Sequence, residues 1–373
     1  MAHAYTPGLR VTEWARLTRE RRLPLKGHVL VGQGDALEAD TIVARCELPG
    51  NVQTVNLAAR LSLDPVKVPA ALLKPLGTQV AKDEPIADSR SLFGLVRTVA
   101  TAPAKGTLES VSSVTGQLIL REPPIPVEVN AFVRGAVAEV LPDEGVLVET
   151  RAAFLQGIFG VGGETFGPIA IVARGPDAAL EAADLTAAHR GQVVVAGAYV
   201  PYAVLMRARE LGVAAVVVGG FDDRDLRQLL GRDLGVAITG SEELGLTLVL
   251  TEGFGHIRMA ERTWRLLAAH QGEQASVSGA TQIRAGVMRP EILIPRAEGA
   301  EQRHPGGESG LEVGSPLRII REPYFGRLGQ VIELPPELQV LETEAAVRVV
   351  VVEFDDDHAR AIIPRANVEL IAE

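Results

Sequence analysis

The sequence predicts a central α/β domain with an all-β module on either side of it, and three observations support this fold class. Over residues 27–156, short runs of Val, Ile and Leu alternate with Gly, Pro and Asp turns, which is typical of β-hairpins. Over residues 157–296, such runs alternate with segments of helical spacing. Residues 312–373 return to short β runs.

Composition limits the class of protein. The 373 residues predict two to four domains, and with only 4% aromatic residues the cores must consist of Val, Leu, Ile and Ala. A formal net charge of −10 disfavours non-specific binding to nucleic acid. Cys46 is the only cysteine, and no apolar run approaches the ~18 residues that span a bilayer. We therefore expect a cytoplasmic protein with no membrane contact.

Residues 1–26 are predicted to form a basic N-terminal arm. Residues 10–26 carry six basic and two acidic side chains. Such a run is typical of a partly disordered arm, and a dedicated binding arm is the alternative.

The β module at 27–156 repeats a short strand, a Gly turn and a returning strand. Its phrases at 77–87 (GTQVAKDEPIA) and 102–111 (APAKGTLESV) resemble the barrel-sandwich hybrid of biotinyl and lipoyl domains, over roughly residues 70–150. The resemblance implies that fold without a specific function. Carriers of this kind expose a modifiable Lys at a hairpin tip. Residues 89–94 (SRSLFG) contain no Lys, which predicts a non-carrier domain.

A glycine-rich segment at 157–168 (GIFGVGGETFGP) joins this module to the next domain. Glycines permit the close backbone approach that phosphate sites require, but dinucleotide loops follow a strand, whereas this segment precedes one. It also resembles a loop in one component of Rnf-type electron-transport complexes, which implies a flavin-linked neighbour. We favour a structural elbow over a site.

The domain at 157–296 is predicted to contain a mainly parallel sheet in three α/β layers, because its continuous apolar strands indicate burial on both faces. The expected strands are 169–173, 192–195, 213–218, 236–239, 246–251 and 292–295. The expected helices are 177–188, 202–211, 222–230 and 257–270.

Loops at the carboxyl edge of this sheet are the predicted ligand site, because open α/β sheets bind ligands there. Free N–H groups at the start of the helix at 257–270 would hold a small anion, with Arg284 as countercharge. Ordinary capping and turn formation is the alternative. The candidate ligand-binding residues are Gly219, Gly220, Thr239, Gly240, Ser241, Thr251, Gly253, Gly255 and Arg284. No spacing predicts a metal ligand or a catalytic residue.

Residues 297–311 are polar and Gly-rich and predict a flexible linker before a C-terminal module. The phrase at 314–331 (GSPLRIIREPYFGRLGQV) resembles a KOW motif. The resemblance implies an SH3-like barrel at 312–373 whose loop contacts RNA or a protein. The candidate partner-binding residues are Arg318, Arg321, Tyr324, Phe325 and Arg327.

Charge favours a protein partner over RNA for this loop. Residues 314–373 contain six Arg and no Lys against eleven acidic side chains, so long-range attraction to RNA is absent. Packing of Tyr324 and Phe325 into the end of the barrel is the alternative.

Taken together, these patterns predict a non-enzymatic binding or scaffold protein with a small anionic ligand in the central domain. An RNA-, transcription- or translation-associated factor that acts through the KOW-like barrel is one alternative. A flavin- or nucleotide-linked redox subunit is the other. The sequence identifies no cofactor.

Overall fold

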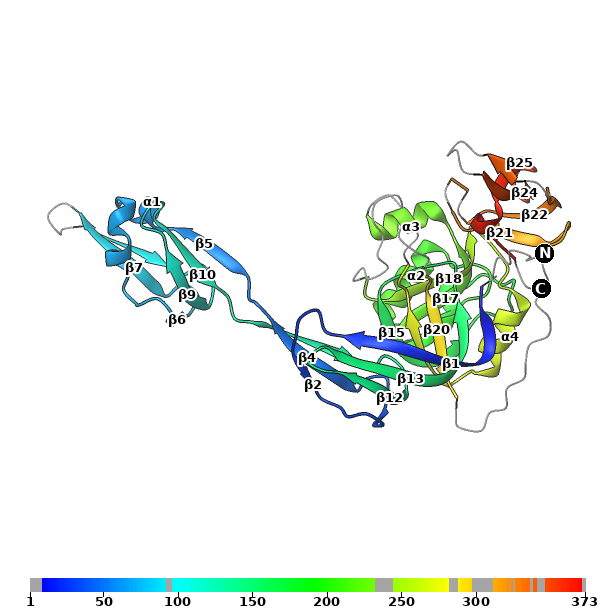
Figure 1. The fold of residues 1–373 in the computed structure, drawn as a ribbon, viewed down its shortest axis with the longest axis horizontal. Helices are drawn as coiled ribbons and strands as arrows, with labels where there is room; N and C mark the ends of the chain where they lie inside the picture. The colour runs from blue at the N-terminus through cyan, green and yellow to red at the C-terminus, as the bar shows by residue number, and fades with distance from the viewer. Residues whose placement is uncertain are drawn as a thin grey trace.

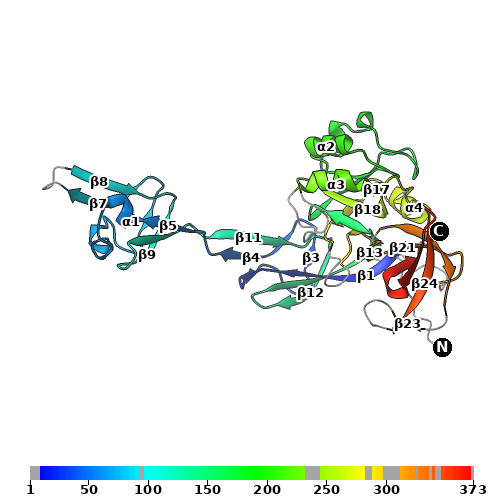
Figure 2. The same ribbon diagram turned by 90° about the horizontal axis from the view of Figure 1, so that it is seen from above.

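The computed structural model describes residues 9–91, 96–231, 244–281, 288–296, 311–321, 323–324, 326–335, 338–340 and 346–370. Over these residues the fold is mostly β, with one large mixed sheet and a half-barrel. Figures 1 and 2 show an elongated molecule in which a small β module stands apart from a larger body.

The distal module has a hydrophobic core of its own. Its elements are β5 (Val52–Asn56), α1 (Leu57–Leu61), 3-10 turns at Pro65–Lys67 and Pro69–Ala71, β6 (Gln79–Val80), β7 (Pro85–Ser91), β8 (Val96–Thr101), β9 (Gly106–Val111) and β10 (Gln117–Arg121). A sheet of order β5-β10-β9-β6 accompanies the hairpin β7–β8. The buried core residues, which include Leu57, Ile86 and Leu118, all lie between positions 55 and 120.

A narrow neck joins this module to the body (Figures 1 and 2). It consists of β4 (Ile42–Leu48) and β11 (Ile125–Asn130), paired antiparallel with Leu48 opposite Ile125; β2 (His28–Val29) pairs with β4. The chain leaves the body through β4 and returns through β11. The structure therefore divides residues 27–156, which the sequence predicted as one domain, between module, neck and body.

The body contains an eleven-stranded sheet. Its strands are β1 (Val11–Arg22), β3 (Ala36–Leu37), β12 (Gly135–Leu141), β13 (Gly145–Gln156), β14 (Phe159–Val161), β15 (Glu164–Ile171), β16 (Val193–Val195), β17 (Ala215–Phe221), β18 (Thr247–Phe254), β19 (Gln274–Ser278) and β20 (Glu291–Pro295). Among the described strands of this sheet, only the neighbours β15-β16-β17-β18 pair in parallel; the remaining pairs are antiparallel. The predicted mainly parallel sheet is therefore wrong, and a mixed sheet replaces it.

Three helices follow the parallel strands: α2 (Tyr202–Leu211), α3 (Asp223–Leu230) and α4 (Glu261–Ala269). Side chains of α2 and α3 pack against one face of the sheet, and those of α4 pack against the other. The helices predicted at 202–211 and 222–230 are confirmed. Asp222 caps α3, because its carboxylate accepts the N–H of Arg224 at 2.8 Å. The helix predicted at 257–270 begins four residues later.

The helix predicted at 177–188 is wrong. The segment forms two 3-10 turns, Ala182–Asp184 and Ala187–His189. The Asp184 carboxylate accepts the N–H of Glu181 at 2.8 Å, and the His189 ring accepts that of Thr186 at 3.1 Å. These local bonds compete with a continuous helix.

The predicted arm is also wrong for residues 11–22, because they form β1, which pairs antiparallel along β13. The C-terminal module is an antiparallel sheet, in agreement with the short β runs predicted at 312–373. It contains β21 (Pro316–Ile319), β22 (Leu328–Glu333), β23 (Leu338–Val340), β24 (Ala346–Phe354), β25 (Arg360–Pro364), a 3-10 turn at Arg365–Asn367 and β26 (Val368–Leu370). The strand predicted at 236–239 and the linker, apart from Leu311, lie outside the described residues.

Candidate functional site

The structure brings together five of the residues predicted to bind a ligand. Gly219 and Gly220 lie in β17, Thr251 and Gly253 lie in β18, and Gly255 follows β18 directly. Gly220 and Gly253 are register partners. Thr239, Gly240, Ser241 and Arg284 lie outside the described residues.

The N–H groups at this rim already have backbone partners. Those of Gly219, Gly220 and Gly255 donate to the carbonyls of Gly197 (2.7 Å), Ala198 (3.0 Å) and Phe221 (2.9 Å). A Cβ on Gly219 would lie 2.2 Å from the Ile257 carbonyl oxygen, so this position requires glycine for close packing of the chain. The three N–H groups therefore offer no cradle to an external anion.

A carboxylate of the chain itself occupies the predicted anion position. Glu252 is 6% exposed and accepts the N–H of Ala260, the N-cap residue of α4, at 3.0 Å. The expected countercharge is also present, but it comes from the C-terminal module: Arg318 Nη2 donates to Glu252 Oε2 at 2.9 Å. The sequence predicted an anion and a cation here and missed which residues provide them.

Four charges form what we call the buried charge cluster: Arg318, Glu252, Glu369 and Arg289. Glu369 pairs with Arg289, and its Oε1 lies 3.9 Å from Arg318 Nη1. Arg318 and Glu369 are each 1% exposed. The cluster joins β21 and β26 to the end of β18, so it fixes the C-terminal module on the body.

Burial raises the pKa of Glu369, against the opposing effects of Arg318, Arg289 and the backbone N–H of Leu9. Removing one partner of such a buried set leaves an uncompensated charge, which is far more costly than losing a surface ion pair. The cluster therefore has a structural role, and its buried groups are not accessible to a partner.

Among the KOW-like residues, Tyr324 and Arg327 contact other residues of the module, and Arg318 pairs with Glu252 of the body. Arg318 is buried, so its expected exposure to RNA or a protein is wrong. The Arg327 guanidinium lies 3.7 Å from the Phe354 ring centroid and pairs with Asp356 and Asp357; the hydrogen bond to Asp356 is the largest cause of its raised pKa. The ring centroids of Tyr324 and Phe354 lie 5.1 Å apart. This packing favours the barrel-end alternative for Tyr324. Arg321 is exposed, and Phe325 lies outside the described residues.

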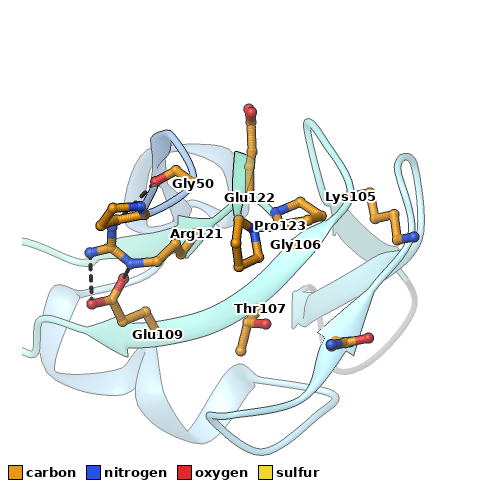
Figure 3. Close-up of a pocket in the computed structure, with 11 residues that line it drawn as sticks. Gly50, Lys105, Gly106, Thr107, Glu109, Arg121, Glu122 and Pro123 are labelled. Carbon is orange, nitrogen blue, oxygen red and sulfur yellow. Dashed lines mark hydrogen bonds and ion pairs between the residues drawn. The ribbon is translucent and has the colours of Figure 1, made fainter. Parts of the chain in front are cut away.

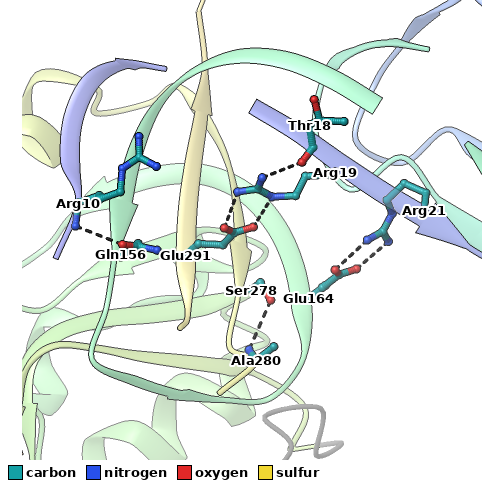
Figure 4. A network of polar contacts seen from close by, with 9 residues as sticks. All are labelled: Arg10, Thr18, Arg19, Arg21, Gln156, Glu164, Ser278, Ala280 and Glu291. Carbon is teal, nitrogen blue, oxygen red and sulfur yellow. Dashed lines mark hydrogen bonds and ion pairs between the residues drawn. The ribbon is translucent and has the colours of Figure 1, made fainter. Parts of the chain in front are cut away.

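The basic residues of β1 are paired with carboxylates from distant parts of the sequence (Figure 4). Arg21 donates to both Glu164 oxygens at 2.8 and 2.7 Å, and Arg19 donates to both oxygens of Glu291. The Arg21 guanidinium lies 5.4 Å from the Phe132 ring centroid, and the Arg19 guanidinium lies 5.8 Å from that of Phe154. These arginines therefore hold the N-terminal strand in place.

An open pocket lies where the neck meets the distal module (Figure 3). Its volume is about 390 Å³, within the roughly 300–1,000 Å³ range of small-molecule sites. The chain enters the module at Pro49–Gly50 and leaves it at Glu122–Pro124, and β9 forms a further wall. A Cβ on Gly50 would lie 1.9 Å from the Glu122 carbonyl oxygen, so the two crossings meet where only glycine fits.

Most charges around this pocket have partners. Arg121 donates to both Glu109 oxygens at 2.7 and 3.0 Å, a contact that raises its pKa. Glu122 accepts from the Gln53 amide at 2.7 Å. Lys105 is exposed at the rim opposite Arg121, and within the described part of the chain no ion pair involves it.

Sequence reasoning missed Glu252, Arg289, Glu369 and this pocket. One signal was present: Arg318 stands between Leu317 and Ile319, and Glu369 stands between Val368 and Leu370. A lone charge inside an apolar strand indicates a buried pair. The pocket had no such signal, because its lining comes from four separate segments.

Comparison with known proteins finds no matching family model and no similar curated protein. Among the described residues, no helix has the length and apolar character needed to cross a membrane. No group of three His, Cys, Asp or Glu side chains in the same residues is arranged to hold a metal ion.

Proposed function

We propose that this is a non-enzymatic binding and scaffold protein, in which a rigid body presents a small β module at a distance. The observation that supports this most directly is the neck. The strands β4 and β11 extend from the core of the body, to which Val43, Ala44 and Cys46 belong, and connect it to a module with a separate core (Figure 1). Such an arrangement separates two binding surfaces along one chain, whereas an active site usually lies between packed elements.

We also propose finer fold assignments for three parts of the chain. The phrases at 77–87 and 102–111 fall on β6, β7 and β9, which supports a barrel-sandwich-hybrid-like, non-carrier module. The phrase at 314–331 falls on β21 and β22, with Gly326 at a φ of 83°, which supports an SH3-like KOW barrel. Helices pack on both faces of β15–β18, which supports a three-layer α/β arrangement of the central domain.

A protein is the partner that we propose for the C-terminal barrel. Leu338 and Ile362 are 60% and 54% exposed there, whereas Arg318 and Arg327, the groups expected to meet RNA, are engaged internally. The small anionic ligand expected in the central domain is not part of the proposal, since Glu252 occupies that position.

Photocross-linking in the native host tests the proposal. A photoreactive amino acid at Val66 or Ile362, 72% and 54% exposed, should form adducts with defined proteins. The same group at Arg265 on α4 serves as a control from the body. An identified partner should bind the purified chain, and Ile362→Asp should weaken binding to the barrel by about tenfold or more. Absence of specific adducts from both test positions would contradict the proposal.

A further inference from the structure

We infer that the pocket at the junction of neck and distal module is a binding site for a small carboxylate with a flat apolar body. This goes beyond the scaffold function, because it assigns a small-molecule site to the module. The inference rests on the shape of the pocket, its prolines and the polar groups for which the described part of the chain provides no partner.

The apolar body is indicated by the walls. Pro49, Pro123 and Pro124 line the pocket together with the backbone of Gly50 and Gly106. Proline rings are rigid, so an apolar molecule that packs on them meets surfaces that lose little conformational entropy on binding. A volume of about 390 Å³ accommodates a fused aromatic ring system with room for a polar group.

The carboxylate is indicated by charge. Both acidic groups of the lining are engaged: Glu109 with Arg121, and Glu122 with Gln53. In Figure 3 the Glu122 carboxylate points away from Thr107 and Lys105. The groups left for a ligand are the Lys105 ammonium, which can only donate, and the Thr107 hydroxyl and Gln79 amide, which can donate as well as accept. A carboxylate satisfies an ammonium and a hydroxyl together.

Fluorescence titration of the full chain with 2-naphthoate tests this site, with neutral 2-naphthamide as the matched ligand. We expect saturable binding of 2-naphthoate and weaker binding of the amide. Lys105→Gln should weaken 2-naphthoate binding about fivefold, the size of a partly exposed ion pair, and Lys105→Arg should retain it. Lys82→Gln, an exposed lysine of the same module outside the pocket lining, is the control and should leave the affinity unchanged.

Thr107→Phe tests the location independently, because a phenyl ring at this wall fills the cavity and should abolish binding. Urea unfolding of this variant verifies that the module is folded. If it is not folded, the comparison of 2-naphthoate affinity between the wild type and Lys105→Gln decides the inference. Three results would each overturn the inference: no saturable binding by the wild type, equal affinity in wild type and Lys105→Gln, or the same loss in Lys82→Gln. Binding that persists in a folded Thr107→Phe chain would do so as well.

Discussion

At the scale of single residues, Glu369 is the most consequential side chain of the buried charge cluster. Its carboxylate contacts both Arg289 and Arg318 and is 1% exposed. Desolvation disfavours the charged form of this carboxylate, and the two guanidinium groups favour it. Burial is the larger effect, so the pKa of Glu369 lies above its ordinary value of 4.5.

This raised pKa predicts a specific dependence of stability on pH. Between the ordinary and the raised pKa, the folded chain holds a proton that the unfolded chain has released. Because unfolding releases that proton, the contribution of Glu369 to the free energy of unfolding falls as pH rises through this window. In Glu369→Gln the group cannot titrate. The difference in unfolding free energy, wild type minus variant, should therefore be flat at the lowest pH and decrease above about pH 4.5.

Urea unfolding at a series of pH values measures this difference. Glu210→Gln, which alters a carboxylate that is 68% exposed, is the control and should show no such decrease. A difference that increases with pH would mean that Arg289 and Arg318 outweigh burial and lower the pKa of Glu369.

At the scale of elements, the sequence predicts best what local residues determine. The helices α2 and α3 were placed within a residue, because Asp222 caps α3 and the glycines at 212 and 231 end both helices in the left-handed conformation. The strand β1 was missed, because what stabilises it is remote. Its arginines pair with Glu164 and Glu291, which follow more than 140 residues later. Local periodicity contains no information about such partners.

The contacts of Arg21 make β1 testable. Arg21→Ala removes two charge-assisted hydrogen bonds to Glu164, one to the Asn130 carbonyl at 2.8 Å and the stacking on Phe132. We expect a loss of about 2 kcal/mol in the free energy of unfolding. Arg16→Ala, on the same strand but 64% exposed, should have almost no effect. Urea unfolding followed by tryptophan fluorescence, to which Trp14 in β1 contributes, provides the measurement. Equal effects of the two substitutions would mean that β1 behaves as the arm predicted from composition.

At the scale of the whole molecule, the sequence predicted the β character of the segments at 27–156 and 312–373 better than the grouping of their strands. The strands of module, neck and body all resemble one another locally, each a short apolar run before a Gly or Pro turn. The pairing that separates them is long-range: β4 pairs with β11 across the whole module, and β1 pairs with β13 across module and neck. The candidate pocket at 49–124 arises from the same pairing, which is why it could not be predicted.

This grouping predicts that the body folds without the distal module. In a variant that joins Leu48 to Ile125 through Asn-Gly, the two paired residues are closed by a two-residue hairpin turn, and β4 and β11 remain paired. No buried residue of the module core comes from the body, so the body loses no core contact. Both tryptophans, Trp14 and Trp264, lie in the body, so thermal unfolding followed by tryptophan fluorescence reports on the body alone. Its midpoint should change by less than about 3 °C.

The converse variant, Leu118→Ala, creates a cavity in the module core and should destabilise the module by about 2–5 kcal/mol while the same fluorescence midpoint stays constant. If the deletion unfolds the body, or if Leu118→Ala lowers the fluorescence midpoint, the two units fold as one and the neck is more than a connection.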